Sequence, residues 1–513
     1  MSRSGSSSRL PTSSQRSAAE VPGSSWPNPT LSLVALVVSL GGGFNFCYQL
    51  LITNSSEEAF LRFTAASHRR LHGSSVVFSD EEIHNLWGII LAILFWGSTV
   101  GAFFIQVIGE KLGRKNGIIF SFLLEIAAIV ATLISWWIEN YILYAAARFV
   151  LGGAISISVG IAPMFITECS PASCRGIISL ATAIMMQIAL VVGAVVAMPE
   201  VWGLEKDWWR MYALELLILI PVTIATCFFR ESPSFLTSRG KNEEAMKSIE
   251  FYHGVQREEA SKLLEENHEA TKDETKEPLG LFGIFGDAPA RRGMLLGNVI
   301  MFGMCMCGII AINAFAYKLL LRVGFAPLEA SIGNAVICAM TVLGVLLSSL
   351  FIERYGRRSL LLVTFTSLAV INVIIYACML IFEHNQSKAL GWAVVISICI
   401  FNVIFSTGPA PISFFITGEL VSQPGRAAAC TWVIVMLNAS RSIVLAIYNP
   451  LEKLVGGPSS YFLLFFPPCV LVVVILYYYL PETRGKSPEE AAEDTAYLPK
   501  LCGQRETSEE DSA

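Results

Sequence analysis

The sequence predicts an all-α membrane protein in which twelve helices cross the bilayer. Hydrophobic residues make up 54% of the 513 residues and charged residues only 15%, whereas a soluble domain carries about 25% charged residues. The apolar residues gather in about twelve runs, and each run approaches the roughly 20 residues that a helix needs to span hydrocarbon. Because backbone polar groups in hydrocarbon must bond within their own segment, we expect each run to be a helix.

The twelve expected spans share this length and contain few charged residues. They cover residues 31–52, 85–108, 116–138, 141–166, 176–199, 208–229, 293–317, 329–352, 358–382, 389–416, 427–448 and 460–480. The polar stretch 230–291 interrupts the series after the sixth span, and its segment 241–266 has the spacing of short amphipathic helices. This interruption predicts two six-helix halves, residues 29–229 and 292–480, joined by a cytoplasmic helical linker.

Basic residues in the short loops predict the orientation of the chain. If the spans alternate in direction, all of these residues fall on one side, and lysines and arginines in short loops are typical of the cytoplasmic side. The residues are Lys111, Arg114, Lys115, Arg175, Arg354, Arg357, Arg358 and Arg426. Both termini are then cytoplasmic, and the polar residues 1–28 and 481–513 are expected to be disordered tails.

Two glycosylation sequences fall on the opposite side of the membrane. The loop at 53–84 lies outside in this orientation, and it begins with Asn54-Ser-Ser56. Asn385-Gln-Ser387 is a second candidate between the ninth and tenth spans. Asn54 stands at the membrane edge, so we expect its sequon to be a weak one.

No residue pattern indicates an enzyme, a metal site or a nucleic-acid-binding surface. The chain has twelve cysteines and six histidines, but no cluster has zinc-ligand spacing. Most of the cysteines lie in apolar runs, where a thiol packs as a small hydrophobic group. The sequence also lacks a nucleophile–base pattern, a phosphate-binding loop and a basic patch. We therefore expect no metal, no cofactor and no nucleic-acid partner.

Charged motifs stand at the cytoplasmic ends of the spans and recur in both halves. In residues 163–176, PMFITECSPASCRG, an acid, a proline and Arg-Gly follow the fourth span, and Glu419 with Arg426 repeats this arrangement after the tenth. The sequence GEKLGRK at 109–115 is echoed by ERYGRR at 353–358. Further motifs are RFVLG at 148–152, RESPSFL at 230–236, GPAPI at 408–412 and PETRG at 481–485.

Together these motifs resemble those of the facilitative hexose transporters, in the sugar porter family of the major facilitator superfamily. The resemblance covers roughly residues 30–490. It implies a major facilitator fold that moves a small-molecule sugar across a lipid bilayer by alternating access, with the solute bound between the two halves. It also implies a location in the plasma membrane, and it leaves the oligomeric state open.

The resemblance further implies that the motif charges form salt bridges at a cytoplasmic gate. These bridges would close the gate in the outward-facing state and break when it opens, and charges this close to a bilayer are costly unless they are paired. The implied gate residues are Arg114, Arg148, Glu168, Arg175, Glu231, Glu353, Arg357, Glu419, Arg426 and Glu482. The alternative is that the basic residues only fix the orientation of the chain.

Amides, hydroxyls and an aromatic ring inside the spans are the candidates for solute binding. A neutral sugar needs hydrogen bonds and an aromatic face rather than charges. The candidates are Gln49, Gln187, Asn313, Asn402, Ser413, Phe414 and Asn438. Gln187 precedes Gly193 by six residues, as in the family pattern. The alternative for a lone amide in a span is a hydrogen bond between neighbouring helices.

Two spans differ from those of the sugar-binding members of the family. In the seventh span, MCMCGII at 304–310 stands where those members have QQLSGIN, so amides that would bond sugar hydroxyls are absent. In the tenth span, Phe414 replaces the tryptophan of the glucose carriers, which resembles the fructose-type branch. We expect the solute to be a small polar molecule, with a hexose such as glucose or fructose as the first candidate.

The residue at position 49 bears on the coupling of transport to protons. Proton-linked sugar porters have an aspartate in this context, whereas Gln49 cannot titrate, so we expect a uniporter. One rival is a proton-coupled transporter of another small organic solute that uses Glu125 or Glu215, the acids inside other spans. The other rival is a solute sensor that has the transporter fold and moves nothing.

Overall fold

All regular structure in the described residues is helical, as the sequence predicts. The computed structural model describes residues 28–72, 79–171, 174–272, 279–322, 324–385 and 388–483. Ten helical stretches in these residues are long and apolar enough to cross a membrane. The all-α membrane class is therefore confirmed.

The helices before the linker form the first group, which we call the N-terminal bundle. They are α1 (Pro29–Gly41), α2 (Gly43–Leu51), α3 (Glu57–His72), α4 (Asp80–Ala102), α5 (Ile105–Lys111), α6 (Arg114–Ile138), α7 (Tyr141–Cys169), α8 (Arg175–Val196) and α9 (Trp209–Cys227). Helices α1 and α2 together form one span, Pro29–Leu51, while α8 contributes a shorter apolar stretch, Ala181–Val196.

The helices after the linker form the second group, the C-terminal bundle. They are α13 (Ala288–Met306), α14 (Ile309–Arg322), α15 (Pro327–Tyr355), α16 (Arg357–Asn385), α17 (Lys388–Thr407), α18 (Pro409–Leu420), α19 (Gln423–Val455) and α20 (Gly457–Tyr479). Helices α17 and α18 belong to one span, Ala389–Leu420. With α8 and the broken pair α13–α14, the twelve expected spans are present.

The seventh span is broken between α13 and α14, and side chains from two other helices hold the break. Gly308 has a φ of 114°, and a β-carbon at this position would lie 2.7 Å from the hydroxyl of Tyr461. The amide nitrogen of Asn372 donates a 2.7 Å hydrogen bond to the carbonyl of Cys307, and Tyr461 donates to Asn372 Oδ1. A carbonyl freed by the break is thus bonded inside the protein, as hydrocarbon surroundings require.

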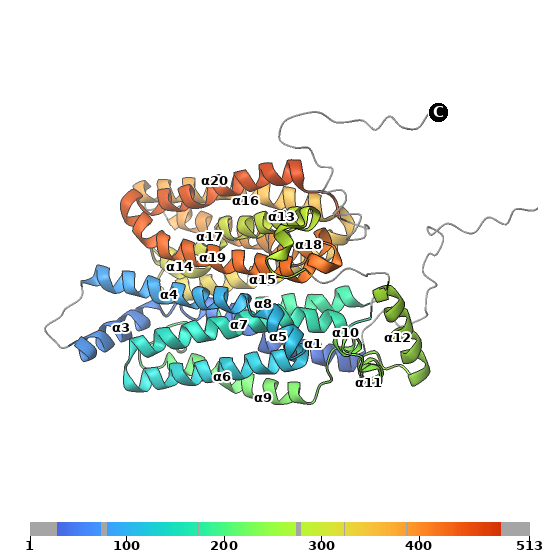
Figure 1. Cartoon of the computed structure of the whole chain (residues 1–513). Coiled ribbons are helices and arrows are strands. Elements are labelled where there is room, and N and C mark those ends of the chain that lie inside the picture. The colour runs from blue at the N-terminus through green and yellow to red at the C-terminus, as the bar shows by residue number, and fades with distance from the viewer. Residues whose placement is uncertain are drawn as a thin grey trace, which may run out of the picture.

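The two bundles lie side by side as two layers (Figure 1). Helix α4 of the N-terminal bundle packs against α19 of the C-terminal bundle, and α8 packs against α15. The linker helices α10–α12 lie at one end of the layers, and α3 lies at the other. We call these the linker end and the far end.

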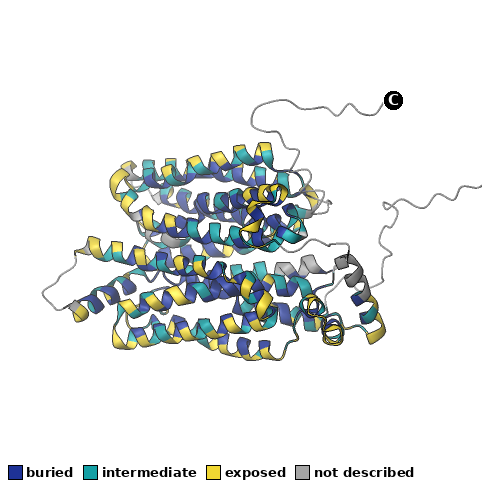
Figure 2. Ribbon diagram, viewed as in Figure 1, coloured by how far each residue is buried: buried dark blue, intermediate teal, exposed yellow. Residues whose placement is uncertain are grey.

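Large apolar side chains cover the outer surfaces of both bundles. Exposed residues lie along the outward faces of the helices, and buried residues lie where the helices meet (Figure 2). Phe228, Trp137 and Leu217 are 79%, 78% and 70% exposed. An apolar surface of this extent is explained by contact with lipid rather than with water.

A helix occupies part of the segment that the sequence predicts as the first outer loop. Helix α3 buries Phe60 and Phe63 against aromatic residues of other helices. Phe60 stacks on Trp87 with ring centroids 5.0 Å apart, and Phe63 meets Trp208 edge-on at 5.2 Å. The i and i+3 spacing of these two phenylalanines was the available sign of an amphipathic helix.

The linker contains short helices, as expected for residues 241–266. They are α10 (Pro233–Ser238), α11 (Asn242–His253) and α12 (Arg257–Lys272), followed by the 3₁₀ turn η2 (Gly283–Phe285). The hydroxyl of Tyr252 donates to the carbonyl of Arg230 at 2.6 Å, and Ser248 donates to the carbonyl of Glu231 at 2.6 Å. These bonds fasten α11 to the end of the N-terminal bundle.

Candidate transport site and gates

A cavity lies between the two bundles. Helices α2, α3, α4 and α7 line it from the N-terminal bundle, and α14 and α19 line it from the C-terminal bundle. Its empty volume is about 620 Å³, which includes space that is open to solvent. We call it the central cavity. Its polar and aromatic lining residues are Gln49, Thr53, Glu57, Trp87, Phe95, Arg148, Asn313 and Arg441.

Arg148 is a fully buried arginine at the cavity wall. Helix α7 carries it, and its exposed fraction is 1%. Its Nη1 donates to the hydroxyls of Tyr144 and Tyr212, at 3.2 and 3.5 Å, and the two hydroxyls lie 2.9 Å apart. Its guanidinium also interacts electrostatically with Glu215. The N-terminal bundle therefore supplies Arg148 with partners of its own.

Two carboxylates are buried in the N-terminal bundle beside neutral hydrogen-bond donors. The amide nitrogen of Gln49 donates to Glu215 Oε2 at 2.5 Å, while Glu215 Oε1 has no partner in the structure. Glu125 accepts hydrogen bonds from Asn45 and Ser158 at 2.9 and 2.8 Å. Glu215 is linked to the cavity through Gln49, whereas Glu125 is not part of the cavity lining.

Arg441 lies at the opposite cavity wall, on α19. It is 8% exposed, and its guanidinium lies 4.8 Å from the ring centroid of Phe46 and 5.9 Å from that of Phe95. Its Nη1 is buried without a hydrogen-bond partner. Arg441 was not among the solute-binding residues predicted from the sequence, although an arginine inside an apolar span is itself a sign of function.

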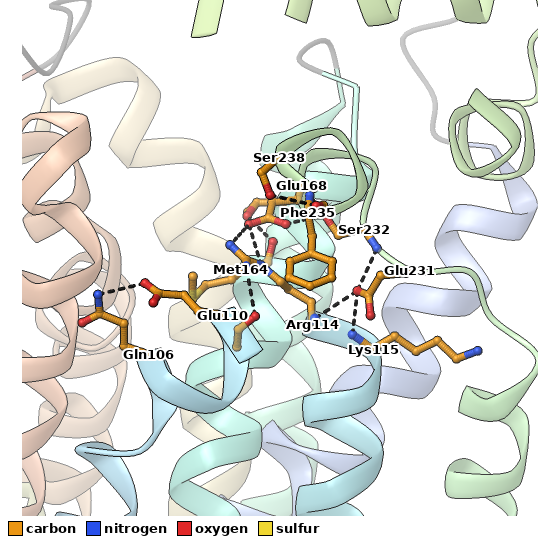
Figure 3. Close-up of polar contacts among 12 residues, drawn as sticks. Gln106, Glu110, Arg114, Lys115, Met164, Glu168, Glu231, Ser232, Phe235 and Ser238 are labelled. Carbon is orange, nitrogen blue, oxygen red and sulfur yellow. Dashed lines mark hydrogen bonds and ion pairs between the residues drawn. The ribbon is translucent and has the colours of Figure 1, made fainter. Parts of the chain in front are cut away.

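A cluster of charged side chains lies at the linker end of the N-terminal bundle (Figure 3). Arg114 donates to Glu168 Oε1 through Nε and Nη2, at 3.1 and 3.0 Å. Glu231 accepts the backbone N–H groups of Arg114 and Lys115 at the start of α6, at 3.0 and 2.9 Å. A carboxylate at a helix N-terminus satisfies free donors and complements the helix dipole. The ring of Phe235 covers the guanidinium of Arg114.

The C-terminal bundle repeats this cluster. Arg357 Nη2 donates to Glu419 at 3.2 Å. Glu482 accepts the backbone N–H groups of Arg357 and Arg358 at the start of α16, at 2.8 and 3.2 Å. Thr483 donates to Glu419, as Ser232 does to Glu168 in the first cluster. We call these the two linker-end clusters.

The comparisons with known proteins identify the family of the chain. The sequence profile described as "Sugar (and other) transporter" matches residues 34–494. The chain belongs to this family. The predicted resemblance to sugar porters is confirmed, and the protein is a multi-pass membrane transporter rather than an enzyme.

The relatives of this transporter cover most of its length. Facilitated glucose transporter member 7 of solute carrier family 2, from Mus musculus, is 25% identical over 410 residues, which are 79% of this chain and 78% of that protein. Member 9 from Mus musculus is 27% identical over 407 residues, 78% of this chain and 74% of that protein.

Solved structures with the same fold come from the proton:xylose symporter XylE. The structure of XylE bound to 6-bromo-6-deoxy-D-glucose has a TM-score of 0.73 at 17% identity, covering 91% of this chain and 99% of that chain. The inward open conformation of XylE from E. coli has a TM-score of 0.72 at 16% identity, covering 90% and 99%. These similarities support the twelve-helix fold of the transporter.

Two of the predicted solute-binding residues line the central cavity of the transporter. They are Gln49 and Asn313. The other five lie outside its lining: Gln187, Asn402, Ser413, Phe414 and Asn438. Three amides of this second set have a buried side-chain oxygen without a partner, namely those of Gln187, Asn402 and Asn438. The Ser413 hydroxyl donates to the carbonyl of Pro409 in its own helix.

Six of the ten predicted gate residues meet in the two linker-end clusters, namely Arg114, Glu168, Glu231, Arg357, Glu419 and Glu482. Arg148 lies apart from both clusters and lines the cavity instead, because it is on the second turn of α7, near the far end. The Nε of Arg426 is buried without a partner. The side chains of Arg175 and Glu353 lie outside the described part of the structure.

Contacts between the bundles at the far end change the interpretation of one glycosylation candidate. Asn54 is 3% exposed, and its amide nitrogen donates to the backbone carbonyl of Asn313 at 2.8 Å. A glycan must be attached to this same nitrogen, so the bond to Asn313 competes with glycosylation of Asn54, which stays a prediction. Asn385 is exposed at the end of α16. Lys453 and Glu81 form a further contact between the bundles, at 2.8 Å.

Proposed function

We propose that this transporter moves a small polar solute of the sugar class down its gradient by alternating access, with a hexose such as glucose or fructose as the first candidate. The central cavity between the two bundles carries the proposal, because polar side chains from both bundles line it. The relatives named as facilitated glucose transporters support the sugar class.

The two linker-end clusters are the proposed inner gate. Each cluster joins helices of a single bundle through Arg114–Glu168 or Arg357–Glu419. Partly buried ion pairs of this kind can exchange their partners for water at modest net cost, which suits an element with two states. The linker end is then cytoplasmic, both termini are inside, and the transporter acts in the plasma membrane.

The domain boundaries belong to the same proposal. Residues 29–229 and 292–480 are the two moving halves, and 230–291 is the linker, which is fastened to the first half at α11 and to the second half at Leu279 and Leu281. Residues 1–28 and 481–513 are cytoplasmic tails. Movement of one half against the other around a site between them is how such transporters alternate their access.

Uniport is the proposed mode because Gln49 cannot titrate. Proton coupling is the second candidate, and one observation favours it: Glu215 is a buried carboxylate that contacts Gln49 at the cavity and has a free oxygen. XylE, whose fold is similar, is named a proton:xylose symporter.

Uptake into proteoliposomes distinguishes these candidates. We expect saturable uptake of labelled glucose or fructose that does not change when a proton gradient is imposed. Uptake that rises with an inward proton gradient would refute uniport and assign the coupling to Glu215, with Glu215→Gln as the check. No uptake of either hexose by folded protein would refute the hexose as the solute.

A further inference from the structure

Arg441 is the residue of the central cavity that a neutral sugar does not explain. It stands near the middle of the spanning helix α19, with 8% of its surface exposed. A cation at this depth is costly unless it is paired or serves a function. Amides and hydroxyls are sufficient to bind an uncharged sugar, so the arginine calls for a separate explanation.

The surroundings of Arg441 do not satisfy its guanidinium. The rings of Phe46 and Phe95 attract a cation through their faces, and the Cys305 thiol is a weak neighbouring acceptor. Its Nη1 has no hydrogen-bond partner. Within the described part of the chain, no ion pair includes Arg441.

The acidic side chains near the cavity come from the other bundle. Glu57 lines the cavity from α3, and Glu215 interacts with Gln49 and Arg148. All of these belong to the N-terminal bundle. Among the described residues of the C-terminal bundle, no carboxylate lines the cavity. Arg441 therefore gives the C-terminal wall of the cavity a positive charge, and no described carboxylate on that wall neutralises it.

We propose that the solute carries a carboxylate, and that this carboxylate binds the guanidinium of Arg441 in the central cavity. A guanidinium can bond a carboxylate through two parallel N–H donors, and Nη1, which has no hydrogen-bond partner, supplies one of them. Trp87 and Phe95 provide aromatic surface for the body of the solute. The inference rests on the proposed function, because it names the charge of the transported solute. A sugar acid and a non-sugar carboxylate share this chemistry.

Two matched pairs of solutes test the inference on the full-length transporter. D-glucuronate and D-glucose share one ring and differ by a carboxylate at carbon 6, while benzoate and benzamide form a non-sugar pair. Affinity is measured by thermal shift in detergent, and transport by uptake into proteoliposomes. In at least one pair we expect the acid to bind about tenfold more tightly than its neutral partner, since hydrogen bonds to charged groups exceed neutral ones.

Variants of Arg441 connect this preference to the proposed site. Arg441→Gln should abolish the advantage of the acid, and Arg441→Lys should retain part of it, because lysine keeps the charge but lacks the fork of donors. Arg62→Gln is the matched control, since its side chain is 62% exposed on α3, outside the cavity lining. Melting temperatures without solute confirm that each variant is folded.

The outcomes separate this inference from sugar transport itself. No preference for either acid, or an acid preference that survives Arg441→Gln, overturns the carboxylate site. Glucose uptake without an acid preference keeps sugar transport and refutes only the inference. Tight binding of benzoate without uptake of either sugar keeps the carboxylate site and refutes the sugar class.

Discussion

Arg148 and Arg441 line one cavity from opposite bundles, but their surroundings differ. Arg148 bonds two tyrosine hydroxyls and has Glu215 as a nearby carboxylate. Arg441 lies over two phenylalanine rings with Nη1 free. Each guanidinium has one buried nitrogen without a partner, Nε in Arg148 and Nη1 in Arg441, so the difference lies in the oxygen partners that Arg148 has and that Arg441 lacks among the described residues. Arg148 is therefore suited to stabilise the N-terminal bundle, and Arg441 is suited to bind a solute reversibly.

The largest expected effect of this contrast is on stability in the absence of solute. Arg148→Met should destabilise the transporter by about 1–3 kcal/mol, because it leaves buried tyrosine hydroxyls and Glu215 without their cation. Arg441→Met should be neutral or stabilising, because an apolar side chain replaces a buried cation that has no anionic partner. Thermal unfolding of the two variants in the same detergent measures the difference.

Equal destabilisation by the two variants would contradict the claim that Arg148 stabilises the fold and Arg441 does not. It would mean that the rings of Phe46 and Phe95 satisfy Arg441 as well as the tyrosines satisfy Arg148. A solute trapped during purification would produce the same result, so both variants and the parent are compared after the same exchange into solute-free buffer.

Arg114 and Arg357 in the linker-end clusters differ from both cavity arginines, because each forms an ion pair with a carboxylate. Arg114→Gln and Arg357→Gln remove one side of an ion pair whose partners are less than 30% exposed. Because these pairs lie at the proposed gate rather than at the cavity, each variant should change the maximal uptake rate about threefold or more. The half-saturating concentration should stay within about twofold, since interactions outside the bound state do not alter affinity.

If solute exchange across the membrane keeps its rate in both directions, the clusters are not a gate. Their basic residues then only fix the orientation of the chain in the membrane. The two variants also serve as each other's control, because the clusters repeat the same bonds. A larger effect of Arg114→Gln would be attributed to the additional contact of Arg114 with Phe235 at the linker helices.

Linker-end residues could be predicted from the sequence, whereas most cavity residues could not. Arg114 and Glu168 belong to motifs that recur in the second half, so the counterpart pair Arg357–Glu419 follows the same pattern. The cavity has no such repeat. Its lining depends on how two bundles pack, which brings together residues as distant in sequence as Gln49 and Arg441. Span periodicity alone does not specify that packing.

Two local sequence patterns in the 53–84 segment did not predict the contacts that the structure shows. The Asn54 sequence satisfies the glycosylation pattern, but the chain turns after α2 and places its amide against the carbonyl of Asn313. The 53–84 segment is polar overall, but Phe60 and Phe63 bury α3 against the aromatic residues of three other helices. In both cases tertiary contacts overrode a pattern that is sound for an exposed loop.

The smallest expected effect concerns Gln187, the amide that the family pattern singled out. Its Oε1 is buried without a partner, although the residue is outside the cavity lining in this conformation. If the solute bonds it when the bundles move, Gln187→Ala should weaken binding about threefold, as one neutral hydrogen bond predicts. Asn116→Ala is the control, because Asn116 is an exposed amide outside the solute-binding candidates and its nitrogen bonds the nearby carbonyl of Leu112. Equal losses in the two variants would assign Gln187 to helix packing and leave solute recognition to the cavity wall around Arg441.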